Sequence, residues 1–65
     1  MIFLTKFSNG DTNDIGLHVQ HIIYIEDCCE GLHTWIYTTH GDRIWVVEPY
    51  EYVLELIEAV RQGKN

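Results

Sequence analysis

The chain has 65 residues, a size at which folding buries only about 60% of the surface that the unfolded chain exposes. Its net charge of −6 argues against binding to nucleic acid or to anionic lipid, because both repel an acidic surface. Its apolar runs fall short of the roughly 18–20 residues that span a bilayer, and its first residues lack the basic segment and long apolar core typical of a signal peptide. We therefore expect one small cytoplasmic domain over residues 1–65, with no membrane insertion. Since small domains commonly gain stability by association, we also expect a homo-oligomer.

The first predicted strand covers residues 2–7. Asn9-Gly10 follows it and is the strongest short signal for a hairpin, because both residues tolerate positive φ. The return strand is predicted over residues 12–18, in which Gly16 marks a bulge or a close approach to the backbone. A break near residues 19–20 then leads into the next strand.

A central strand is predicted over residues 21–27, which are rich in β-branched and aromatic side chains. Strict alternation places Ile23 and Ile25 on one side of it and Ile22 and Tyr24 on the other, so both sides are apolar. The turn that follows contains Cys28-Cys29. Neighbouring cysteines can form a disulfide only through a strained ring, so we expect two reduced thiols in a reducing compartment.

Two further strands are predicted over residues 33–40 and 43–48. A two-residue loop at His40-Gly41 or at Gly41-Asp42 joins them, and either loop sorts the side chains in the same way. One face then carries Trp35, Tyr37, Ile44 and Val46, and the other carries Ile36, Thr38, Trp45 and Val47. Both faces are apolar, and a single helix can cover only one of them.

The predicted helix covers residues 49–62. Pro49 suits the first helical position, Glu48 suits the positive end of the helix dipole, and Arg61 suits the negative end. One apolar stripe contains Tyr50, Val53, Leu54, Leu56, Ile57 and Val60. The whole chain therefore predicts an α+β fold: an antiparallel β-meander of four to five short strands followed by one C-terminal amphipathic helix.

The histidines and cysteines are the only set of residues that could form a metal site. Zinc commonly takes four ligands arranged as two close pairs in the sequence. His18 and His21 alternate to different faces of a continuous strand, and Cys28-Cys29 lacks the usual spacer. The remaining histidines are His33 and His40. We expect no metal and no cofactor, and a metal-stabilised structural domain remains an alternative.

Enzymatic activity is not expected. A nucleophilic site needs a cysteine, serine or threonine beside a histidine, a third residue that orients the base, and a substrate pocket. No sequence signature of such a site is present. A domain of this size also leaves little room for a cavity of the roughly 300 Å³ or more that ligand sites use.

The aromatic residues of the last two strands suit a core or a protein interface. Base stacking normally needs basic neighbours, and only Arg43 is close. The interface candidates are Trp35, Tyr37, Ile36, Trp45 and Val47. We expect a non-catalytic protein–protein interaction module with a protein partner. The alternative, suggested by charge and size, is a small acidic phage-type inhibitor or nucleic-acid mimic that blocks a host enzyme.

The chain also resembles the FlbD family of small flagellar proteins, which includes the swarming motility protein SwrD. The matching residues are Met1-Ile2, Leu4-Thr5, Asn9-Gly10, Ile22, Ile25-Glu26, Ile36, Gly41, Val46, Glu48, Val53 and Ile57, with one residue inserted near the first turn. The resemblance implies a short β-meander closed by a C-terminal helix. It also implies a non-enzymatic role linked to the flagellum, and it supplies no catalytic residues.

Overall fold

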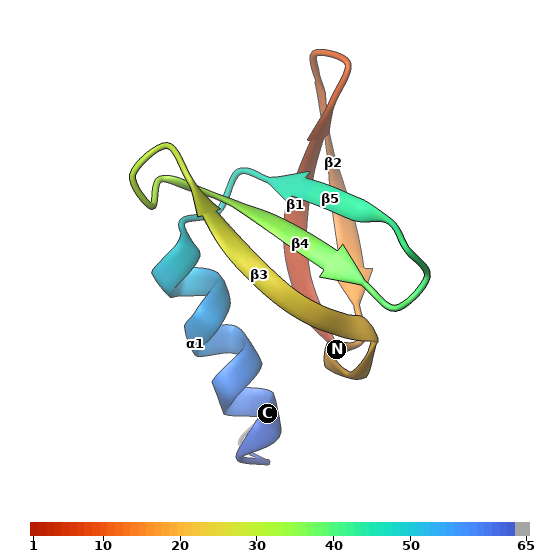
Figure 1. Ribbon diagram of the computed structural model, residues 1–65, viewed down its shortest axis with the longest axis vertical. Helices are drawn as coiled ribbons and strands as arrows, with labels where there is room; N and C mark the ends of the chain where they lie inside the picture. The colour runs from red at the N-terminus through yellow and green to blue at the C-terminus, as the bar shows by residue number, and fades with distance from the viewer. Residues whose placement is uncertain (64–65) are drawn as a thin grey trace.

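Five strands and one helix form the computed structural model, which describes residues 1–63 (Figure 1). The elements are β1 (Ile2–Ser8), β2 (Asp11–Leu17), the 3₁₀ turn η1 (Val19–His21), β3 (Ile22–Cys28), β4 (His33–Thr38), β5 (Arg43–Val46) and α1 (Tyr50–Arg61). The predicted α+β class, with antiparallel strands followed by a C-terminal helix, is confirmed. Each predicted element ends within about two residues of the observed one.

The strands lie in the order β2-β1-β5-β4-β3, and every neighbouring pair is antiparallel. The sheet thus consists of the β1–β2 hairpin and the β3–β4–β5 meander, which are joined by pairing of Lys6 in β1 with Val46 in β5. Figure 1 shows the hairpin crossing the meander at a steep angle. Strands β2 and β3 are consequently the two edges of the sheet.

The first hairpin has the predicted turn. Asn9 and Gly10 have positive φ angles of 53° and 82°. Positive φ at both residues is what a two-residue hairpin loop needs if its twist is to match that of the flanking strands. Strands β1 and β2 pair without interruption, so Gly16 does not mark a bulge. It marks a close approach instead, because a Cβ atom at Gly16 would lie 2.8 Å from the Met1 sulfur.

The core lies between the sheet and α1. Its buried apolar side chains come from every part of the chain: Ile2, Leu4, Val19, Ile22, Ile36, Val46, Val53 and Ile57. Helix α1 packs on β3 and β4 through Val53 and Ile57. The other members of the predicted helix stripe are half-buried. Helix α1 thereby covers one face of the sheet, and the opposite face lies on the side away from the helix.

Glu48 fixes the junction between β5 and α1. Its Oε1 accepts a hydrogen bond from the Thr5 backbone N–H at 2.9 Å. Its carbonyl oxygen accepts one from the Thr34 hydroxyl, also at 2.9 Å, and Thr34 is completely buried. The first helical N–H, that of Tyr50, donates to the Gly31 carbonyl in the β3–β4 turn at 3.1 Å. These hydrogen bonds therefore tie the helix start to strands β1 and β4 and to the β3–β4 turn.

The loop between β4 and β5 differs from the prediction. The Thr38 N–H donates to the Asp42 carbonyl at 2.9 Å, and the Gly41 N–H donates to the Thr38 carbonyl at 3.1 Å. The loop therefore has three residues and uses Gly41 with φ of 86°. One additional loop residue shifts the register by one, which sends the side chains of one strand to the opposite face. The predicted sorting of the two strands is wrong.

The observed register pairs Trp35 with Trp45. The face toward the helix carries Thr34, Ile36, Thr38, Ile44 and Val46, and the opposite face carries His33, Trp35, Tyr37, Arg43 and Trp45. The register of β3 also shifts, between Ile22 and Tyr24. As a result Ile22 and Ile25 face the core, and Ile23 is 59% exposed, so the alternation predicted for β3 is wrong as well.

Candidate functional site: an aromatic sheet face

The sheet face opposite α1 gathers aromatic rings from four strands. In β4, alternate residues place His33, Trp35 and Tyr37 on this face. Register places Trp45 of β5 beside Trp35 and Tyr24 of β3 beside Tyr37. The aromatic face, as we call it, consists of Phe7, Tyr24, His33, Trp35, Tyr37 and Trp45.

The rings pack on each other across the strands. Phe7 meets Trp45 edge-on at 5.4 Å between ring centroids, and the His33 ring lies 4.6 Å from Trp45. Tyr24 and Tyr37 are stacked at 4.4 Å with planes 11° apart. Such pairs add stabilisation beyond the area they bury. The face is therefore an ordered surface in which most rings have a fixed neighbour.

Polar groups orient several of these rings. The Arg43 guanidinium lies over the Trp35 ring, 4.4 Å from its centroid. The Tyr37 hydroxyl donates to Glu26 Oε1 at 2.7 Å, and this bond raises the pKa of Tyr37 because it favours the protonated phenol. The His33 Nδ1–H donates to the Val47 carbonyl at 2.9 Å, which defines the His33 tautomer.

The aromatic face stays partly open to solvent. Trp35, Tyr37 and Trp45 are half-buried, and they owe this burial to each other since α1 packs on the opposite side. Phe7 is 41% and Tyr24 50% exposed. Contiguous exposed aromatic surface on a small protein commonly marks an interaction site.

Three of the five predicted interface residues lie together on this side of the sheet: Trp35, Tyr37 and Trp45. Val47 follows the last residue of β5 and is half-buried. Ile36 lies on the opposite face. It is completely buried in the core beneath the helix, so its prediction as an interface residue is wrong. The two tryptophans were expected on opposite faces, and the register places them on one.

Sequence reasoning missed Phe7, Tyr24 and His33 as members of the face. The signal for His33 was present, because it alternates with Trp35 and Tyr37 along one strand. Phe7 joins only through the pairing of β1 with β5, and Tyr24 only through the register shift in β3. Neither feature has a local sequence signal.

Two free cysteines lie at the rim of the aromatic face, where β3 enters its turn. Their Sγ atoms are 3.0 Å apart. Cys28 pairs with His33, and its pKa is lowered by the neighbouring Cys29 thiol and then by the Trp45 side chain. The same contact between the thiols raises the pKa of Cys29.

Three of the histidines gather at the other end of the sheet. The His21 ring lies 5.9 Å from His18 and 5.4 Å from His40, and its Nδ1 is hydrogen-bonded to the Thr39 hydroxyl at 3.4 Å. Within residues 1–63, no three histidines, cysteines or acids are placed to hold a metal ion together.

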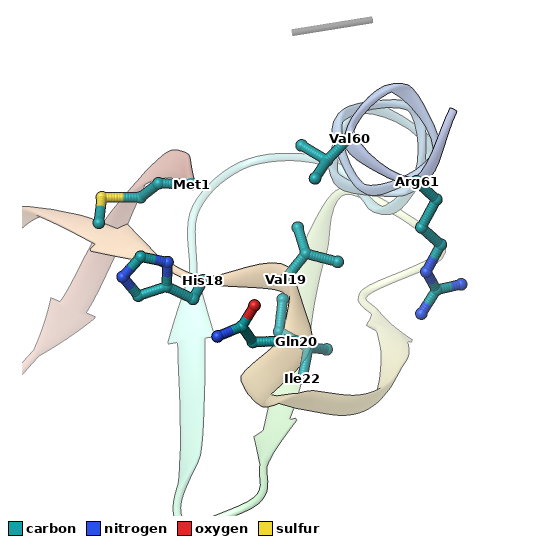
Figure 2. A pocket seen from close by; sticks show the side chains of 7 residues that line it. All are labelled: Met1, His18, Val19, Gln20, Ile22, Val60 and Arg61. Atoms are coloured by element: carbon teal, nitrogen blue, oxygen red, sulfur yellow. The ribbon is translucent and has the colours of Figure 1, made fainter. Parts of the chain in front are cut away.

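A hollow of about 390 Å³ lies beside the C-terminal end of α1, larger than the sequence led us to expect. Seven residues line it (Figure 2): Met1, His18, Val19, Gln20, Ile22, Val60 and Arg61. None of these seven offers a hydroxyl, thiol or carboxylate that His18 could activate. In Figure 2 the Arg61 side chain extends away from His18, so the two do not converge on one ligand.

The acidic side chains do not form one surface. Asp11 and Asp14 lie on β2, Glu26 and Asp27 lie on β3, and Glu51, Glu55 and Glu58 lie on α1. Strands β2 and β3 are opposite edges of the sheet. A mimic of a phosphate backbone needs a continuous run of negative charge, so this distribution does not favour the nucleic-acid-mimic alternative.

The chain matches no protein-family model, no curated protein and no solved structure. In residues 1–63, no helix combines the length and the apolar character that crossing a membrane requires. The aromatic face is the feature of this structure whose residue types and exposure best indicate a function.

Proposed function

We propose that the protein is a non-catalytic protein–protein interaction module that self-associates through its aromatic face, in the manner expected of a FlbD-like accessory protein in the cytoplasm. The observation that carries this proposal is the placement of Trp35, Trp45 and Arg43 together on the face that the helix leaves uncovered. The residue types, the small core and the charges around β4 support it in turn.

The residue types are those on which interfaces depend. In alanine scans of protein interfaces, the residues whose replacement weakens binding most are enriched in tryptophan, tyrosine and arginine. These residues cluster near the centre of the interface. Trp35, Arg43 and Trp45 form such a centre here, while Phe7 and Tyr24 lie on the flanking strands β1 and β3. Because the rings are already packed on one another, little side-chain entropy is lost when a partner covers them.

The small core gives self-association a stabilising role. Among residues 1–63, the largest fully buried side chains are those of Ile36, Val46, Val53 and Thr34. A domain of this size gains from burying further apolar area against a second copy. Both sheet edges carry acids, Asp14 on one and Asp27 on the other, which oppose edge-to-edge pairing of strands. The face is therefore the better surface for contact between copies.

Charges on the two sides of β4 suit a two-fold pairing. Glu26 lies on β3 and Arg43 on β5, one on each side of Trp35. A two-fold axis parallel to β4 brings β3 of one copy over β5 of the other. Each Glu26 carboxylate then faces the Arg43 guanidinium of the second copy, so the surface is complementary to itself.

Light scattering over a dilution series, together with acrylamide quenching of tryptophan fluorescence, tests this proposal. We expect a dimer whose tryptophans become accessible on dilution, and we expect Trp35→Ala to shift dissociation to at least tenfold higher concentration. Tyr52→Ala is the matched control, since Tyr52 is 48% exposed on the helix and lies outside the face.

A charge exchange tests the two-fold arrangement itself. Arg43→Glu and Glu26→Arg should each weaken association, and the double variant should restore part of it because opposite charges face each other again. A wild-type monomer at high concentration whose tryptophans are already shielded from quencher would contradict the proposal. Equal association of wild type and Trp35→Ala would contradict it as well.

A further inference from the structure

The Cys28–Cys29 pair has a geometry suited to reaction. The two Sγ atoms are 3.0 Å apart, roughly 1 Å more than the length of a disulfide bond. Cys29 is exposed at the start of the turn, and Cys28 is half-buried beside Trp45. A reagent can therefore reach the pair from solvent, and each sulfur can reach the other.

The backbone of this turn does not explain why a cysteine occupies position 29. Cys29 and Glu30 both have φ of 59°, in the left-handed region that disfavours side chains other than those of Gly, Asn and Asp. The first hairpin of the same chain meets this requirement with Asn9-Gly10. Position 29 thus holds a thiol where conformational preference favours asparagine or glycine.

We propose that Cys28 and Cys29 form a thiol–disulfide exchange site that reacts with small disulfides of the glutathione class. In the first step the Cys28 thiolate attacks one sulfur of the disulfide, a mixed disulfide forms, and one glutathione thiolate leaves. In the second step the Cys29 sulfur, after losing its proton, attacks the Cys28 sulfur and expels the second glutathione thiolate. The protein dithiol loses two electrons, and one glutathione disulfide becomes two thiols.

The surroundings assign different roles to the two sulfurs. The Cys29 thiol, 3.0 Å away, and the Trp45 side chain beside it lower the pKa of Cys28, which increases the thiolate fraction that attacks first. The pKa of Cys29 is raised, so this thiol stays protonated until the mixed disulfide has formed. Cys28 is thus the attacking residue, and Cys29 is the resolving residue.

The product is a labile modification rather than a structural crosslink. Adjacent Cα atoms are about 3.8 Å apart, below the usual 4.4–6.8 Å of disulfide-linked residues, so the ring is strained and easily reduced. Ring closure also changes the chemistry of the Cys28 sulfur that lies beside Trp45. Oxidation should therefore alter the environment of one tryptophan of the aromatic face.

Intact-mass spectrometry of the full chain treated with oxidised glutathione tests the proposal. We expect the wild type to lose the mass of two hydrogens and to retain no glutathione. We expect Cys29→Ser to retain one glutathione, because the resolving thiol is gone, and Cys28→Ser to react several-fold more slowly. Excess reduced glutathione should reverse the wild-type reaction, and tryptophan fluorescence should follow it in wild type but not in Trp45→Phe.

Three results would overturn the proposal: a wild-type chain that keeps glutathione as Cys29→Ser does, a disulfide between two chains, or no reaction in either protein. Far-UV circular dichroism of each variant shows whether it is folded, and Cys→Ser exchange is close to isosteric. Because the readout is the mass of single chains at high dilution, the result is independent of whether the protein self-associates.

Discussion

Tyr37 shows how one hydrogen bond gives this protein a defined response to pH. Its phenol donates to Glu26 at 2.7 Å, and the acceptor carries a negative charge. The bond raises the pKa of Tyr37 above its usual value of about 10, because losing the proton would place two anions side by side. The stabilisation is therefore fully present below the unfolded-state pKa of tyrosine and is lost as pH rises through the higher folded-state pKa.

We predict that ultraviolet absorbance during alkaline titration detects Tyr37 as a late-titrating tyrosine. Tyr37→Phe should remove that late component, and Glu26→Gln should return it toward pH 10 by removing the charge while keeping an oxygen acceptor. Tyr52→Phe is the control and should leave the late component in place. An unchanged late component in Glu26→Gln would show that Glu26 is not its cause.

At the scale of elements, the sequence predicted the positions of the strands and the helix along the chain. It did not predict which face of the sheet each side chain occupies. The β-branched run of β3 and Pro49 before the helix are local signals, and both elements begin within one residue of the prediction. Pro49 is the N-cap of α1, with extended backbone, and not its first helical residue as predicted. The three-residue β4–β5 loop was not foreseen, because Gly41 serves a two-residue loop and a three-residue loop equally well. That single residue moved Trp45 to the same face as Trp35 and Ile36 to the core.

The pairing of β1 with β5 was also beyond sequence reasoning. It joins residues that are far apart in the chain, such as Lys6 and Val46, and no local pattern encodes it. Alternation within β4 correctly placed Trp35 and Tyr37 on one face, while Phe7 needed this long-range pairing. Local propensity thus defined the elements, and tertiary contacts decided which of them meet.

The β3–β4 turn provides the prediction for a single element. Cys29 holds a left-handed conformation that costs a residue with a side chain about 1–2 kcal/mol. Cys29→Asn should therefore raise the free energy of unfolding by about 1 kcal/mol in urea denaturation. Cys29→Ser keeps the backbone penalty and should leave stability unchanged. A gain of equal size in both variants would mean that the thiol, and not the conformation, is the destabilising group.

For the whole molecule, the small core makes each buried side chain important. A 65-residue domain has a total stability of roughly 3–10 kcal/mol. The helix is held to the sheet mainly by Val53 and Ile57, which are 0% and 3% exposed. Losing either one removes a large share of the stability that the whole domain possesses.

Ile57→Ala should accordingly lower the free energy of unfolding by about 2–5 kcal/mol through lost burial and the cavity left behind. Tyr52→Ala, on the exposed side of the same helix, should change it by less than about 0.5 kcal/mol. Urea denaturation followed by circular dichroism measures both. A small loss for Ile57→Ala would mean that the sheet is stable without the helix.

The pairing of β1 with β5 also decides when the protein can fold during its synthesis. Lys6 leaves the ribosome about 40 residues ahead of its partner Val46. A lone two-stranded hairpin is at best marginally stable in water, so Ile2 and Leu4 have no lasting cover until β5 and α1 emerge. The nascent chain is consequently open to chaperones and proteases until β5 and α1 have emerged.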